Sequence, residues 1–262
     1  TVTYTFKLRD GIKWSDGQDV TANDFEYAWK RLVNPETAAD YSYMLDCVVN
    51  AQDIIDGNKP ADELAVKAVD DKTFEVTLVN DLPYFEELCA FPAMMPVRQD
   101  MIEKGGDQWT FNVDTYISNG AYKMKEWTHN SQIVVEKNEN YYDFENLGPE
   151  TITFKLMDNQ NAMLSGFKSG ELDFIQDAPQ AEITSLIASG DMKIVDYIGT
   201  YYVCFQTEKE PFNDPKVRKA FSLAIDRTYI VNQVTQSGQV EAGGFVPAGI
   251  YDAEGTDGDD FR

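Results

Sequence analysis

The sequence predicts an α/β protein in two parts, a compact α+β unit up to about residue 113 and a longer run in which strands alternate with helices. Stretches with apolar residues at every second position predict half-buried strands, and apolar residues three or four apart predict amphipathic helices. The 43% hydrophobic content of the 262 residues excludes general disorder. Alternating strands and helices indicate a mixed or parallel sheet that is covered on its faces.

The first element is a strand, because Val2, Tyr4, Phe6 and Leu8 alternate with polar residues. The chain starts inside this pattern and without Met, so we expect that an upstream segment has been removed or omitted. The acidic end of the chain is expected to be cut as well and to be a solvated tail.

A helix from about residue 22 to 33 follows, since Thr21 and Asp24 have the spacing of a capping box and Pro35 ends the helical pattern. The same signals predict the other elements of the first part. These are a tyrosine-bearing loop or short helix at 36–46, a short helix at 48–55, a hairpin of strands 65–69 and 73–79, and helices at 84–90 and near 98–104.

Beyond residue 119, two alternating stretches predict a second hairpin, with His129 at its tip. Asp214 and Pro215 form a good helix start, an acceptor followed by a proline. The expected elements are strands 121–127, 132–137, 151–157, 172–174, 193–195 and 201–205, and helices 159–169, from 179, from 215 and from 227. The buried face of the helix from 215 is expected to consist of Val217, Ala220, Phe221, Ala224 and Ile225.

Charge and cysteine usage exclude several classes of protein. The net charge of −23 would repel phosphate backbones and anionic lipid, so we expect no nucleic-acid partner. No apolar run approaches the roughly 18 residues of a membrane span. Cys47, Cys89 and Cys204 are odd in number and widely spaced. They predict buried thiols, with neither a disulfide framework nor a metal site.

The sequence predicts no catalytic centre, no metal and no cofactor. His129 is the only histidine, which excludes a two-histidine metal motif and argues against a catalytic triad. The stretch 166–170 does not match a phosphate loop, because Phe167 stands before the lysine. Neighbouring carboxylates such as Glu86 and Glu87 are expected by chance among 45 acidic residues.

Several blocks, in order, resemble the dipeptide/oligopeptide-binding family of ABC-transporter solute-binding proteins, and most of all its oligopeptide-binding members. The block at 4–17 resembles the family signature, and the others follow it in the family's order. The remaining blocks are 20–29, 66–78, 118–122, 169–173 and 211–227. The resemblance extends to about residue 247.

The resemblance implies a type II periplasmic-binding-protein-like α/β fold, three-lobed and cluster C-like, here truncated at both ends. It implies that 1–113 is an accessory lobe, that 114–210 is part of the first ligand-binding lobe, and that 211–262 leads into the second, which is mostly absent. Full-length members of the family are about twice as long as this chain.

The same resemblance supplies candidate ligand-binding residues. Tyr201 and Tyr202 match a strand that faces the ligand, and Tyr43, or alternatively Tyr41, matches an aromatic residue that reaches the cleft from the accessory lobe. Tyrosine suits such a wall, because it offers a rigid apolar ring with a hydroxyl group. The alternative is that one of the strand tyrosines lies in the core and that the loop tyrosines cover Trp29.

Asn119 and Gly120 lie where the chain crosses between lobes, as a flexible joint or as a plain β-turn. The implied function is an extracytoplasmic, monomeric solute-binding protein, free in the periplasm or a cell-surface lipoprotein. It would capture oligopeptides by lobe closure and deliver them to membrane permease subunits. The alternatives are another solute of the same family (a dipeptide, nickel chelate, oligosaccharide or signalling peptide) and a peptide- or glycan-processing hydrolase on a similar scaffold.

Overall fold

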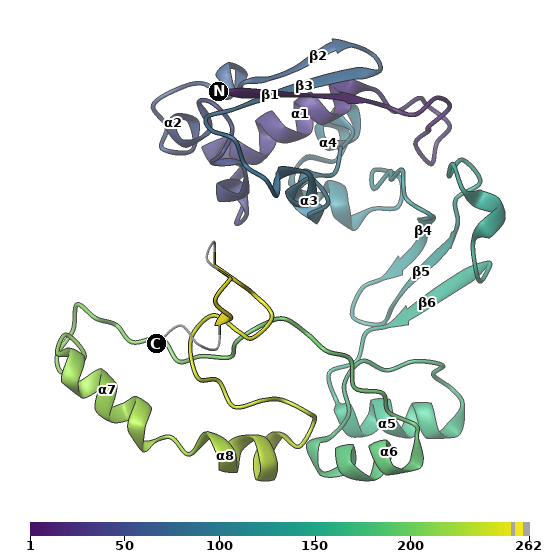
Figure 1. Ribbon diagram of the computed structural model, residues 1–262. Helices are drawn as coiled ribbons and strands as arrows, with labels where there is room; N and C mark the ends of the chain where they lie inside the picture. Colours follow the sequence, from purple (N-terminus) through teal and green to yellow (C-terminus); the bar gives the residue numbers. More distant parts are fainter. Residues whose placement is uncertain (253–254, 259–262) are drawn as a thin grey trace. The chain divides into compact units, whose positions relative to one another are not determined.

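The computed structural model describes residues 1–252 and 255–258 (Figure 1). It divides into two compact units, the first spanning residues 1–156 and the second beginning at Met157, and each is described by itself. The predicted acidic tail lies partly outside the described residues, since 253–254 and 259–262 are not covered.

The first unit opens with an antiparallel three-stranded sheet in the order β1-β3-β2. Phe6 of β1 lies opposite Phe74 of β3, and the alternating burial along β1 confirms the predicted period of two. Helix α1 packs against β2 and β3 and covers one face of this sheet (Figure 1). The bounds are β1 (Val2–Lys7), α1 (Ala22–Val33), β2 (Val66–Asp70) and β3 (Thr73–Leu78).

Helix α1 begins as the sequence predicts. The Asp24 carboxylate accepts a hydrogen bond from the Thr21 backbone N–H at 2.8 Å, which satisfies a donor that the first helical turn leaves free. Trp29 is the centre of the buried face, and its indole N–H donates to the Met94 carbonyl at 2.9 Å. Its ring meets Phe74 edge-on at 5.2 Å. The core around it includes Ala28, Val33, Leu45, Val48, Ile54, Val66, Val76, Leu78 and Phe85.

Short helices complete the part of the unit that precedes the second sheet, and their order agrees with the prediction. Helix α3 is shorter than the predicted 84–90, because backbone bonds from Ala90 to Glu87 and from Phe91 to Leu88 tighten its last turn into 3₁₀ geometry. The bounds are α2 (Ala51–Ile55), α3 (Phe85–Leu88) and α4 (Gln99–Gly105), followed by a 3₁₀ segment (Gly106–Phe111).

The second sheet of the first unit is antiparallel in the order β4-β5-β6 and confirms the predicted hairpin. His129 is exposed at the hairpin turn, as predicted, and its ring stacks on Trp127 at 4.5 Å. Every strand pair among the described residues is antiparallel, so the mixed or parallel sheet expected from the alternating pattern is not found there. The bounds are β4 (Tyr122–Thr128), β5 (Gln132–Lys137) and β6 (Thr151–Lys155).

The second unit is helical where it has regular structure, and α5 and α7 begin at the predicted signals, whereas α6 begins at Ile183, after a 3₁₀ turn that follows Pro179. Asn159 and Asp214 cap α5 and α7 through their side chains, and Gly170 ends α5 at a φ of 79°, which favours glycine. No helix in the described ranges is long and apolar enough to span a membrane. The bounds are α5 (Gln160–Ser169), α6 (Ile183–Ser189), α7 (Pro215–Ala224), α8 (Arg227–Tyr229) and a π-helical turn (Ile230–Thr235).

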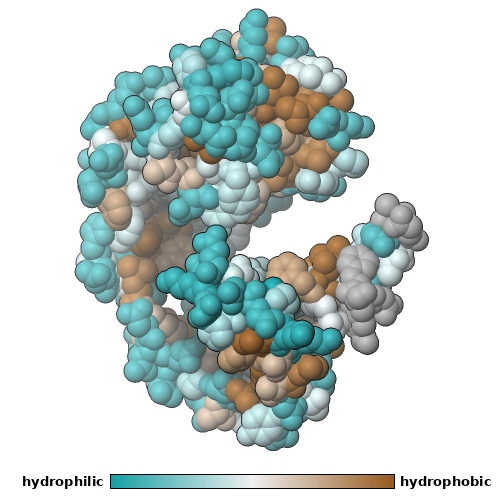
Figure 2. All heavy atoms as spheres, turned by 90° about the vertical axis from the view of Figure 1, so that its left-hand side faces the viewer, coloured by the Kyte–Doolittle hydropathy of each residue, from teal (hydrophilic) through white to brown (hydrophobic). Residues whose placement is uncertain are grey.

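Two predictions for the second unit are wrong. The stretches 172–174, 193–195 and 201–205 are not strands, because a strand needs a neighbouring strand for its backbone hydrogen bonds and the described residues pair none with them. The predicted buried face of α7 is not buried, and Phe221 is 49% exposed. Hydrophobic side chains are visible at the surface in Figure 2.

The cysteines are free thiols, and the prediction that all three are buried is wrong for Cys204. Cys204 is exposed because it lies in the extended stretch that forms no strand. Cys47 and Cys89 are half-buried against the core of the first sheet. Burial, with smaller contributions from Cys47 and Glu86, raises the pKa of the Cys89 thiol to about 11.

We therefore expect Cys89 to be alkylated slowly at neutral pH, since the thiolate is the reactive form. Its alkylation rate in the folded full-length protein, followed by mass spectrometry of the peptide that contains it, should rise with pH up to about 11. The same peptide in urea-unfolded protein should level off near the ordinary thiol pKa of about 8.5. A plateau at that lower pH in the folded protein would contradict the burial argument.

Candidate functional site

Tyr201 and Tyr202 lie on an extended stretch of the second unit, and both are exposed. Tyr201 is fully exposed at 102%, while Tyr202 is 56% exposed and meets the ring of Phe245 edge-on at 4.8 Å. Neither side chain is part of a core, so the alternative that one of them is buried is wrong. Their contact with a ligand stays a prediction.

Tyr41 and Tyr43 form a second aromatic pair, in the first unit. Their rings lie 6.1 Å apart, and Tyr41 meets Phe91 at 5.0 Å. They are 48% and 55% exposed. Trp29, which they were alternatively expected to cover, packs its ring on Phe74 and Phe85. The two tyrosine pairs belong to different units, so each pair is a separate candidate surface.

Asn119 and Gly120, the candidate joint, lie in a crossover that is held on both sides. Before them, the Ser118 carbonyl accepts a hydrogen bond from the Ser15 N–H at 2.7 Å. After them, the Gly120 carbonyl accepts one from the side chain of Asn138 at 2.8 Å. Asn138 is completely buried, and its own oxygen accepts from the Asn140 N–H at 3.0 Å.

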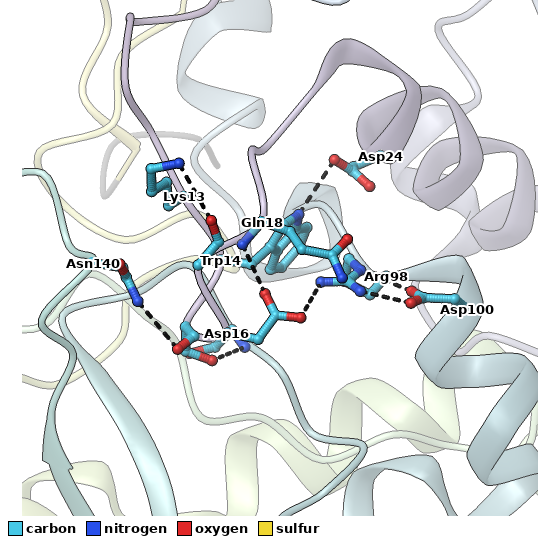
Figure 3. Close-up of polar contacts among 11 residues, drawn as sticks. Lys13, Trp14, Asp16, Gln18, Asp24, Arg98, Asp100 and Asn140 are labelled. Atoms are coloured by element: carbon cyan, nitrogen blue, oxygen red, sulfur yellow. Dashed lines mark hydrogen bonds and ion pairs between the residues drawn. The ribbon is translucent and has the colours of Figure 1, made fainter.

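The loop of residues 14–18 has its own set of polar contacts, which Figure 3 shows around Trp14 and Asp16. Trp14 is almost fully buried, and its indole N–H donates to Asp24 at 3.3 Å. The Asp16 carboxylate accepts from the Gln18 N–H at 3.1 Å and from Arg98 at 2.8 Å. These bonds fix the loop internally and against the residues that precede α4.

Arg98 is the most buried charged residue of this network, with 5% of its side chain exposed. Its guanidinium donates two hydrogen bonds to Asp100, at 2.7 and 2.6 Å, in the paired geometry that suits a carboxylate. Hydrogen bonding to Asp100 and then to Asp16 raises the pKa of Arg98. The bond from Arg98 in turn lowers the pKa of Asp100.

This shift predicts a pH dependence of stability. A carboxylate whose pKa is lowered by folding stabilises the protein above its unfolded pKa of about 3.9, and the stabilisation is lost as the pH falls through the folded value. Asp100→Asn should therefore lower the thermal midpoint of the full-length protein at neutral pH by more than at about pH 3. An equal difference at both pH values, measured by circular dichroism, would contradict the assignment.

Within residues 1–252 and 255–258, no group of three or more His, Cys, Asp or Glu side chains is arranged to hold a metal ion. The structure contains two exposed aromatic pairs on separate units, Tyr41 with Tyr43 and Tyr201 with Tyr202. It also contains a buried polar network whose hydrogen bonds hold the crossover at 118–120. Aromatic surfaces of this kind bind ligands through apolar contact and hydroxyl hydrogen bonds.

Comparison with known proteins places the chain among the bacterial extracellular solute-binding proteins. Residues 1–261 match the model of the bacterial extracellular solute-binding proteins, family 5 middle, and the chain belongs to that family. It is 40% identical over 249 residues to the periplasmic oligopeptide-binding protein OppA of Salmonella typhimurium, covering 93% of this chain and 46% of that protein. It is also 40% identical over 250 residues to the oligopeptide-binding protein OppA of Bacillus subtilis, covering 94% and 46%.

A solved structure of a relative supports the same family assignment. The crystal structure of Haemophilus influenzae OppA in complex with the peptide RPPGFSPFR superposes with a TM-score of 0.86 at 37% identity, covering 95% of this chain and 49% of that one. The family resemblance and the α/β fold of type II periplasmic binding proteins are thus confirmed. The chain spans about half the length of the curated relatives it matches.

Sequence reasoning missed Arg98, Asn138 and the aromatic partners Phe91 and Phe245. Arg98 precedes a short helix without any periodic pattern, and Asn138 follows a strand as an ordinary polar residue. Asp16 stands out in the sequence only as part of the family-like block at 4–17. The sequence carries little indication of these residues, because the pairing of a charged side chain with a partner far along the chain depends on the folded structure.

Proposed function

We propose that this protein is the extracytoplasmic solute-binding component of an ABC transporter, which captures oligopeptides by closure of two lobes and delivers them to permease subunits. The observation that carries the proposal is the family match over residues 1–261, together with 40% identity to oligopeptide-binding relatives. The peptide complex of the Haemophilus influenzae relative supports the ligand class. In this proposal the protein releases its ligand chemically unchanged.

The proposed role of each segment follows the lobes that the resemblance implies. Residues 1–113 form the accessory lobe, 114–210 contribute to the first ligand-binding lobe, and 211–262 lead into the second. Tyr201 and Tyr202 contact the peptide from the first ligand-binding lobe, and Tyr43, with Tyr41 beside it, contacts the peptide from the accessory lobe. Their exposure supports these roles, since a side chain must be accessible to bind a ligand.

The contacts of such a site are expected to be largely independent of peptide sequence. A protein that accepts many peptides must hold the peptide backbone, while roomy pockets that contain water accommodate the varied side chains. We further propose that the protein acts as a monomer outside the cytoplasm, in the periplasm or as a cell-surface lipoprotein.

The proposal is tested by incubating the full-length protein with a defined pool of synthetic peptides, isolating the complex and identifying its contents by mass spectrometry. We expect intact peptides of several sequences in the complex and an unchanged pool in solution. Cleaved or modified peptides would favour the hydrolase alternative. If no peptide is found in the complex and the protein instead shows a thermal shift with a nickel chelate, an oligosaccharide or a dipeptide, its ligand is another solute of the family.

A further inference from the structure

The 14–18 loop joins two parts of the first unit that are far apart in the sequence. On one side it is anchored near α1 and α4, because Trp14 donates to Asp24 and Asp16 accepts from Arg98. On the other side Ser15 bonds to Ser118 in the crossover that leads into β4, and Asn140 points toward the loop (Figure 3). The loop is therefore one link between the first sheet with its helices and the second sheet, beside the stacking of Phe111 on Trp127 at 5.4 Å and the contact of Arg9 with the Tyr142 ring at 4.4 Å.

Ser15 makes this link with all three of its hydrogen-bonding groups. Its N–H donates to the Ser118 carbonyl at 2.7 Å, and its hydroxyl oxygen accepts from the Ser118 N–H at 3.3 Å. Its carbonyl accepts from the side chain of Asn140 at 3.3 Å. Ser118 precedes β4 and Asn140 follows β5, so Ser15 bonds to the chain on both sides of the hairpin.

Arg98 bonds to the loop through Asp16, and Asp100 in turn holds Arg98 in place. Asp100 occupies two of its N–H groups, which leaves another to hold Asp16 at 2.8 Å. The guanidinium also lies 5.9 Å from the centre of the Trp14 ring. A planar guanidinium presents its donors in a rigid fork, and with 5% exposure it is little screened by salt.

The geometry points to Arg98 as a positioning residue of a clasp, in which it holds the 14–18 loop so that Ser15 fastens the crossover at 118–120 and the two sheets move as one body. This inference goes beyond the proposed function and does not depend on which ligand is bound. It also makes Asn119 and Gly120 part of a fixed bend in place of a flexible joint, and places any lobe movement at another part of the chain.

The clasp is tested by hydrogen exchange of the ligand-free full-length protein and its variants Arg98→Met and Asp16→Ala. Each variant should raise amide exchange at 118–122 and 137–141 at least about tenfold, because hydrogen bonds to charged groups contribute that much to local protection. Amides of β3 should keep the wild-type rate, since the clasp is not part of the first sheet.

Asp19→Ala is the matched control, because it removes a carboxylate from the same region, where Asp19 forms an exposed ion pair with Lys13 at 2.8 Å. It should leave exchange at 118–122 unchanged. If Arg98→Met does not fold, Asp16→Ala decides the question, since it retains the bonds between Arg98 and Asp100. Unchanged protection at 118–122, or an equal loss of protection in β3, would overturn the clasp.

Discussion

Replacing Trp29 with alanine should lower the free energy of unfolding of the first unit by about 3–5 kcal/mol. Trp29 is 2% exposed and fills the space between α1 and the first sheet, where its ring contacts Phe74 at 5.2 Å and Phe85 at 6.3 Å. The substitution leaves a cavity and deprives the Met94 carbonyl of its indole donor. Urea unfolding of the full-length protein, followed by far-UV circular dichroism, measures the loss.

Two further variants separate the causes of this effect. Trp29→Phe keeps most of the apolar volume but removes the donor, so it should cost about 1–3 kcal/mol, the penalty for leaving a buried acceptor unsatisfied. Tyr84→Ala removes an aromatic ring that is 60% exposed and should stay within about 0.5 kcal/mol of the wild type. A Trp29→Ala protein as stable as Tyr84→Ala would contradict the described core.

The Tyr201→Ala substitution should weaken oligopeptide binding by the full-length protein about tenfold to a hundredfold. A buried aromatic contact at an interface is worth roughly 1–3 kcal/mol, and each 1.4 kcal/mol is a factor of ten in affinity. Tyr201 is fully exposed in the structure, so its loss should leave the thermal midpoint of the ligand-free protein unchanged. Titration calorimetry with one tight-binding peptide measures the affinity.

Tyr197→Ala is the matched control for this experiment. Tyr197 lies on the same extended stretch and is 92% exposed, but it is not among the predicted ligand contacts. Its replacement should change neither affinity nor stability. Equal affinities of the wild type and Tyr201→Ala would remove Tyr201 from the proposed site. An equal loss of affinity in Tyr197→Ala and Tyr201→Ala would show that the effect is not specific to the Tyr201 side chain.

Local signals in the sequence were sufficient for the helices and hairpins. Helix α1 follows from a capping pair, an apolar stripe and a proline, all within fifteen residues, and both hairpins follow from alternation around a turn. The stretches at 193–195 and 201–205 carry the same apolar character but are not strands. The difference is physical, because a helix satisfies its backbone internally while a strand depends on a distant partner.

The candidate site was predictable to a smaller extent. The four tyrosines were found through the family resemblance, and all four are exposed as a ligand surface requires. The contacts around Arg98 could not be predicted, because Asp16 and Arg98 are 82 residues apart and neither belongs to a periodic pattern. Such pairs are determined by the tertiary arrangement, and only the structure brings them together.

The central claim, that the protein binds oligopeptides without altering them, is tested most directly by isothermal titration of the full-length protein with mixed tripeptides to pentapeptides. The account predicts saturable heat with peptides of different sequence, and recovery of those peptides intact afterwards. The absence of heat and of a thermal shift with every peptide pool would contradict it, and so would a steady heat that accompanies conversion of the peptides into products.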